Sequence, residues 1–227
     1  MNNSQNLTLH VFSNGACGPA EQKAFEKTYA LWKSVWGQTL KELDGLDVLT
    51  SDNFSRQHEI LSLFIDDICV AIVCHRYVDL SLLSSRDDSY FKPWPQEAFK
   101  KLCAHGNKAA IGSQITIHSG YRGESPFGRI KNVITSLSLR HLMDTDVDVI
   151  AGTMRADKGM NRLFYNCGAE PIESHVILHN VEVDLVAFFP KVNPIKIASE
   201  SRDAIEMIWG NRVSENSKNI NQLKRAG

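Results

Sequence analysis

The sequence lacks the features that would place it in several specialised classes of protein. It has five cysteines, an odd number, and no C-x-x-C pair, so neither a disulfide framework nor a finger-type zinc site is indicated. No apolar run reaches the roughly 20 residues of a membrane helix. The N-terminus has no basic segment leading into an apolar core, so no signal peptide is expected. These absences predict a cytoplasmic protein without a membrane span.

Charge of one sign is also not in excess, because 25 Lys and Arg residues stand against 26 Asp and Glu residues. A chain with this balance is not expected to bind nucleic acid broadly. Hydrophobic residues make up 43% of the 227 residues, too many for a disordered chain. The length alone fits one or two domains. The order of predicted elements favours one domain over 1–198, followed by a helical tail over 199–227.

Hydrophobic spacing and turn residues predict strands mixed with helices along the chain. The segment 79–108 is polar, contains two prolines and is interpreted as an excursion over a pocket. This order predicts an α/β (α+β) fold, with a mixed sheet covered by helices. The predicted strands lie within 1–20 and over 60–65, 68–77, 109–118, 147–153, 171–178 and 181–189; the predicted helices lie over 21–44, 95–104, 130–143 and 157–167 and beyond 199.

Three local expectations follow from the same patterns. Cys69 and Cys74 are five residues apart, so a regular strand would point them to opposite faces. Asp157 is a candidate N-cap of the helix over 157–167. The last hairpin is expected to turn at His179-Asn180.

The most informative segment is 109–143, in which a strand runs into a glycine-rich loop that opens a helix. Such a loop directs backbone N–H groups and a helix N-terminus toward one place, which suits a phosphate or pyrophosphate. Arg122 and Arg129 could add charge-assisted contacts. The loop matches neither the G-K-[ST] of a Walker A loop nor the dinucleotide G-x-G-x-x-G pattern. A plain surface turn is the alternative interpretation.

Three stretches together resemble the GNAT superfamily of acyl-CoA-dependent N-acyltransferases. They are YRGESPFGR over 121–129, VDVIAGTMR over 147–155 and NRLFYNCGAEPI over 161–172. The resemblance implies a GNAT-like mixed, splayed central sheet flanked by helices, with a C-terminal helical tail. The helix over 24–43, followed by Asp52, Phe54, Arg56 and Gln57, resembles the acyl-homoserine-lactone and long-chain N-acyl amino acid synthases within that superfamily.

The resemblance implies transfer of an acyl group from acyl-CoA, or from the phosphopantetheine arm of acyl carrier protein, to a small-molecule amine. The amine attacks the thioester directly, and the backbone of 114–117 polarises the thioester carbonyl. No metal and no nucleic acid are expected, and the last strand or the tail helix could pair two copies of the chain. The donor-binding residues implied are Ile115, Ile117, Arg122, Gly123, Gly128, Arg129 and Asn161.

Three side chains are candidates for proton transfer. His118 closes the strand beside the loop and has a side-chain type whose ordinary pKa suits a general base; the alternative is a strand-end histidine bonded to solvent or backbone. Glu59 could act through a water molecule. Tyr165 is a candidate acid for the leaving thiolate, although Phe164 takes its place when the segment is aligned on Gly168.

The sequence also departs from the family pattern. Ser125-Pro126-Phe127 replaces the middle glycine of the loop, and Pro126 removes one N–H donor. These departures leave two rivals to an enzyme: a non-catalytic GNAT-fold module that binds a CoA-like ligand or a protein, and an α/β protein for another phosphate ligand. His175 and His179 lack an evident third ligand, so they do not indicate a metal site.

Overall fold

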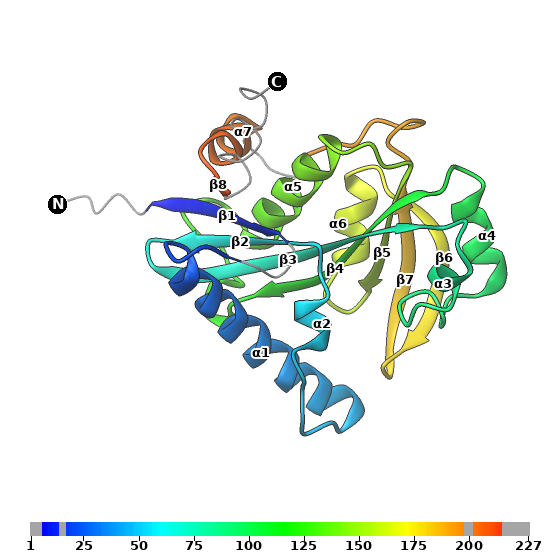
Figure 1. Ribbon diagram of the computed structural model, residues 1–227, viewed down its shortest axis with the longest axis horizontal. Helices are drawn as coiled ribbons and strands as arrows, with labels where there is room; N and C mark the ends of the chain where they lie inside the picture. The colour runs from blue at the N-terminus through cyan, green and yellow to red at the C-terminus, as the bar shows by residue number, and fades with distance from the viewer. Residues whose placement is uncertain (1–5, 14–16, 198–201, 215–227) are drawn as a thin grey trace.

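The computed structural model describes residues 6–13, 17–197 and 202–214, and its centre is one mixed sheet of eight strands. The strand order is β6-β7-β5-β4-β3-β2-β1-β8 (Figure 1). All neighbours pair antiparallel except β4 with β5 and β1 with β8. The strands are β1 (Leu7–Ser13), β2 (Glu59–Ile65), β3 (Ile68–Asp79), β4 (Lys108–Ile117), β5 (Val149–Arg155), β6 (Glu170–Leu178), β7 (Val181–Phe188) and β8 (Val213–Ser214).

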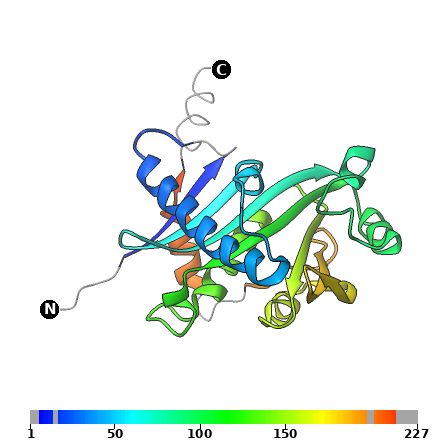
Figure 2. The same cartoon turned by 90° about the horizontal axis from the view of Figure 1, so that it is seen from below.

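Helices cover both faces of the sheet, as the sequence predicts. One face, called here the α1 face, packs against α1 and α2 and, farther along, against the segment with α3 and α4 (Figures 1 and 2). The other, called the α5 face, packs against α5, α6 and α7. The helices are α1 (Gln22–Asp44), α2 (Asp52–Ser55), α3 (Leu83–Arg86), α4 (Gln96–Cys103), α5 (Ile130–Met143), α6 (Met160–Asn166) and α7 (Arg202–Gly210).

Helix α5 confirms the prediction made from apolar spacing, and its bounds are the predicted ones. Ile130, Val133, Ile134 and Leu137 are buried and lie in one core cluster with β1, β2 and β3. Because these positions recur every three or four residues, they form the stripe that an amphipathic helix turns toward a sheet. This packing fixes the start of α5 directly after the glycine loop.

The prediction that Cys69 and Cys74 face opposite sides is wrong. The pairing of β2 with β3 skips one residue, so that Leu63 faces Ala71 and Phe64 faces Cys69. The extra residue is a β-bulge, which shifts the alternation of side chains by one position. Both cysteines therefore lie in the core cluster on the α1 face, and both are free thiols.

The prediction that Asp157 caps α6 is also wrong. The helix begins at Met160 after Gly159, which has a left-handed φ of 64°, while Asp157 forms an ion pair with Arg155. The predicted hairpin turn is confirmed, since His179 and Asn180 have φ values of 51° and 57° between β6 and β7. Two successive positive φ values match the twist of the flanking strands.

The end of the chain contributes more to the sheet than the sequence indicates. Helix α7 buries Ile205, Ile208 and Trp209 in the same cluster as α5 and β1, and β8 then pairs in parallel with β1. The predicted boundary at 198/199 falls outside the described residues, as do 215–227. Within the described part of the chain, none of the helices is both long and apolar enough to cross a membrane.

Candidate active site

The two parallel strands β4 and β5 separate halfway along their length. They pair only from Ala109 with Val149 to Gly112 with Gly152. Beyond this point β4 stays with β3, whereas β5 continues beside β7. The last five residues of β4, 113–117, therefore have no strand on their β5 side among the described residues. An extended ligand could take that place and bond to the free backbone edge.

A β-bulge lies at the start of this opening. The β3–β4 pairing steps from Cys74–Ser113 to Ile72–Thr116, so β4 carries one extra residue there. Gln114 has a left-handed φ of 56°, which is uncommon for a residue with a side chain and concentrates at functional sites. The bulge turns backbone groups of β4 away from the regular ladder and toward the opening.

Two tryptophans of α1 hold the bulge from the α1 face. The indole N–H of Trp32 donates to Gln114 Oε1 over 2.8 Å, and that of Trp36 donates to Thr116 Oγ1 over 3.0 Å. Thr116 Oγ1 in turn donates to the Gln114 carbonyl over 2.7 Å. Ile115 points the opposite way, into the core clusters of the α5 face. The two tryptophans of α1 thus orient the bulge.

The glycine loop lies at the end of β4 and before α5. His118 Nδ1 accepts from the Gly120 N–H over 3.1 Å. Gly128 has a left-handed φ of 78°, which glycine adopts without strain. Arg129 bonds Glu124 over 2.5 Å, whereas Arg122 Nε reaches only the Ile117 carbonyl, over 3.4 Å. The loop is ordered by its own side chains and lies next to the opening.

A hydrogen-bond cluster is built around Asp184 of β7, one strand beyond the opening, because β5 lies between β7 and β4. The Asp184 carboxylate accepts from Tyr165 Oη over 2.6 Å, from Asn161 Nδ2 over 2.8 Å and from the His175 N–H over 3.2 Å. Burial raises the pKa of Asp184, but the hydrogen bonds outweigh burial and leave that pKa below its ordinary value. Burial and the bond to Asp184 raise the pKa of Tyr165 to about 12.

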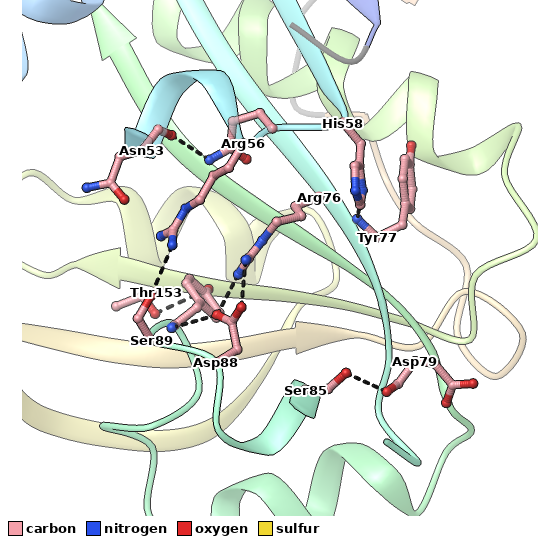
Figure 3. Close-up of polar contacts among 12 residues, drawn as sticks. Asn53, Arg56, His58, Arg76, Tyr77, Asp79, Ser85, Asp88, Ser89 and Thr153 are labelled. Carbon is pink, nitrogen blue, oxygen red and sulfur yellow. Dashed lines mark hydrogen bonds and ion pairs between the residues drawn. The ribbon is translucent and has the colours of Figure 1, made fainter. Parts of the chain in front are cut away.

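Polar residues gather on the α1 face beside β5. Figure 3 shows Arg76 of β3 aimed at Asp88, and two bonds of 2.6 Å join them. Next to this pair, Arg56 Nη1 donates to Ser89 Oγ over 3.2 Å. The segment with these residues also brings the Tyr90 hydroxyl to 3.3 Å from Thr153 Oγ1, one residue past the point where β5 diverges. The segment over 79–108 thus packs on the sheet and lies beside the opening.

Glu59 lies elsewhere, on the α5 face at the beginning of β2. Its carboxylate accepts from the Tyr77 hydroxyl and forms an ion pair of 2.6 Å with His141 Nε2. Burial raises the pKa of Glu59, but His141 and Tyr77 together lower it to about 2. The neighbouring His75 is fully buried, and burial lowers its pKa to about 3. A carboxylate held in this way is a weak proton acceptor.

The candidate site thus brings together most of the residues selected from the sequence. Ile115, Ile117 and His118 line one side of the opening, and the loop closes its end. Asn161 and Tyr165 lie on α6 and bond to Asp184 of β7, one strand beyond β5. Sequence reasoning does not find Asp184, because a single aspartate inside an apolar strand belongs to no motif. Its only sequence signal is that a charged residue interrupts the apolar run VEVDLVAFF.

The register and the loop together define a class of fold: a mixed sheet that opens between two parallel strands, above a glycine loop and a helix N-terminus. No protein-family model matches the sequence, and no curated protein does either. Solved structures match over most of the chain, and they show that it has the GNAT fold.

Three of these structures are similar over nearly their whole length. FeeM, an N-acyl amino acid synthase from uncultured soil microbes, is 12% identical with a TM-score of 0.56, covering 85% of this chain and 94% of its own. BjaI, a CoA-dependent acyl-homoserine lactone synthase, is 13% identical with a TM-score of 0.56, covering 92% and 94%. The acyl-homoserine-lactone synthase LasI is 14% identical with a TM-score of 0.53, covering 93% and 99%.

Proposed function

We propose that the chain is an N-acyltransferase that takes an acyl group from acyl-CoA or acyl carrier protein and transfers it to a small-molecule amine. One observation carries the proposal: β4 leaves β5 at Gly112 and Gly152 and is bulged at Gln114 immediately beyond. A pantetheine arm laid along this edge would bring its thioester carbonyl to backbone N–H donors of the bulge. The three similar structures, all named for acyl-transfer enzymes, support the same reaction class.

In this mechanism the chain supplies alignment rather than a covalent intermediate. The glycine loop and Arg122 would hold the phosphates of the donor, since a loop before a helix N-terminus favours anions. The amine would approach from the α1 face, beside Thr153 and Arg56, and lose its proton through intervening water to His118, which lies beyond the end of β4 beside the loop. The nitrogen then attacks the carbonyl, the carbon–sulfur bond breaks, and the thiolate takes up a proton.

Donor binding is tested best at Gly123, because a Cβ added there meets nothing within 4 Å. Gly123→Ala should fold normally and weaken donor binding, since the added methyl group would stand where a phosphate approaches.

Donor binding to the unsubstituted chain should appear as a rise in Tm. A donor at about 100 times its Kd should raise Tm by about 5–10 °C. Differential scanning fluorimetry with acetyl-CoA, long-chain acyl-CoA and acyl carrier protein measures this.

The matched control is Gly37→Ala in α1, where a Cβ also meets nothing within 4 Å. This variant should bind donors like the unsubstituted chain. If none of the three donors raises Tm, the proposed acyltransferase activity is refuted, and the chain is better explained as a binding module for another ligand. A shift without release of free thiol, over a panel of amines, would support a non-catalytic module instead.

Proton transfer is tested by two substitutions in the same thiol-release assay. His118→Ala should lower kcat by about 100-fold, the usual contribution of a general base, with little change in donor binding. Tyr165→Phe should lower kcat less than tenfold, because its hydroxyl is engaged by Asp184 and its raised pKa makes it a weak acid. Unchanged turnover in His118→Ala would remove that residue as the base.

A further inference from the structure

A second group of chemically active side chains lies on the α5 face, beginning at His75, the β3 partner of Gly112 where the opening starts. One carboxylate oxygen of Glu59, one ring nitrogen of His75 and one of His141 all lie within 4.8 Å of one another. The acyl-transfer mechanism uses none of them. Two histidines and one carboxylate at this spacing are a common ligand set for divalent transition metals.

The two strands of one hairpin, β2 and β3, and the more distant helix α5 build this group. Glu59 and His75 are direct partners in the β2–β3 register, so their side chains stand next to each other. Helix α5 crosses above them and supplies His141 and, one turn earlier, Ser138. The imidazole rings of His75 and His141 lie 5.3 Å apart at 12° between their planes. A bound ion would therefore join two strands to the end of the helix.

The two ring nitrogens of His75 have different surroundings. Its Nε2 lies 2.7 Å from Ser138 Oγ, whereas its Nδ1 is buried and has no hydrogen-bond partner among the described residues. A buried polar atom without a partner costs free energy and calls for an explanation. If Ser138 Oγ accepts a hydrogen bond from the Nε2–H group, Nδ1 keeps a lone pair that can bind a metal ion. Hydrogen bonds from outer-shell residues fix the tautomer of metal-binding histidines in the same way.

We propose that Glu59, His75 and His141 form a binding site for one divalent transition metal ion of the zinc type. Ligand atoms about 2.1 Å from a tetrahedral ion stand about 3.4 Å apart. In the present structure Glu59 and His141 are 2.6 Å apart, and all three ligand atoms lie within 4.8 Å of one another, so small side-chain shifts would bring them to that spacing. The Tyr77 hydroxyl, which contacts Glu59 and lies 3.4 Å from His141 Nε2, is placed to supply the fourth ligand atom.

The side chains of Glu59 and His141 keep 22% and 12% of their exposure, so an ion can reach the site without unfolding the chain. Trp209 of α7 packs edge-on against the His141 ring at 5.4 Å and shields the same side. Because the site ties α5 to β2 and β3, the ion would act structurally. It would stiffen the helix whose other end carries the glycine loop.

The experiment titrates Co²⁺, and then competing Zn²⁺, into the full chain after dialysis against a chelator. We expect one equivalent to bind, with the visible absorption of a four-coordinate nitrogen–oxygen site and a rise in Tm. Glu59→Gln and His141→Gln should each weaken binding by at least about tenfold, and Ser138→Ala by about 10–100-fold. His179→Gln is the matched control, since His179 also pairs with a carboxylate, that of Asp44, and should leave binding unchanged.

Absence of saturable binding would overturn the proposal, and so would binding that Glu59→Gln and His141→Gln leave intact while both variants melt cooperatively. Should either variant not fold, the Co²⁺ spectrum of the unsubstituted chain decides. A weak six-coordinate spectrum overturns the site, and an intense four-coordinate one supports it. No acyl substrate enters this experiment, so its failure would leave the proposed acyl transfer untouched.

Discussion

Replacing Asp184 by alanine is expected to lower the free energy of unfolding by about 2–4 kcal/mol. The substitution removes the shared acceptor of Tyr165 Oη, Asn161 Nδ2 and the His175 N–H. His175 has a left-handed φ of 61°, so the lost bond also leaves a strained residue of β6 without support. Urea unfolding followed by circular dichroism measures the loss.

Asp184→Asn is the matched variant, because it keeps the volume and one acceptor oxygen and should cost less than the alanine. Its pH dependence gives a second check. The pKa of Asp184 is lower in the folded chain than in the unfolded one, so its ionisation stabilises the fold above the unfolded pKa of about 3.9. This contribution is lost as pH falls toward the folded pKa. The asparagine variant should show a smaller loss on acidification, and equal losses would contradict this role.

Replacing Trp32 by phenylalanine is expected to lower turnover by about 100-fold, the scale of a 1 Å displacement in a reacting site. The change removes the N–H donor to Gln114 Oε1 and leaves that oxygen without its indole partner. Since Gln114 sits at the bulge with a positive φ, its backbone is expected to relax and move the N–H groups that would polarise the thioester. The loss in stability should stay near 1–3 kcal/mol. Thiol-release kinetics and urea unfolding measure the two effects.

Trp94→Phe is the control for this substitution. Trp94 is also buried, but its indole N–H has no hydrogen-bond partner among the described residues. The same reduction in ring size there removes no hydrogen bond, so turnover should stay near that of the unsubstituted chain. Similar losses of turnover in both variants would show that ring volume, and not the bond to Gln114, is what matters.

The regular helices and turns of this fold can be predicted from short segments of the sequence. Helix α5 could be bounded at Ile130–Met143 because its apolar stripe begins after the loop and ends at polar residues. The final hairpin could be placed because few residue types tolerate two successive positive φ values, and His179-Asn180 lies between two apolar strands. In each case a short window of residues contains the physical cause.

The missed features depend on partners far away in the chain. The bulge that moves Cys69 to the α1 face arises from the pairing of β3 with β2, and no residue type at the bulge predicts it. The bulge at Gln114 likewise arises from the pairing of β4 with β3 and has no local sequence signal. The sequence indicates the loop and the strand of the candidate site. It does not indicate Asp184, because that residue matters only through its hydrogen bonds with Tyr165 and Asn161. Glu59 was selected for catalysis, and only the fold places it beside His75 and His141.

The pairing of β8 with β1 has a consequence for the order in which the protein can mature on the ribosome. His10 is made early, whereas its partner Val213 follows near the end of the described chain. At about 5–20 residues per second, the interval between them is on the order of ten to forty seconds. During that time the outer edge of β1 (Figure 1) is open to any other strand. Until β8 is made, this edge of β1 is therefore a place where the nascent chain can mispair with another strand.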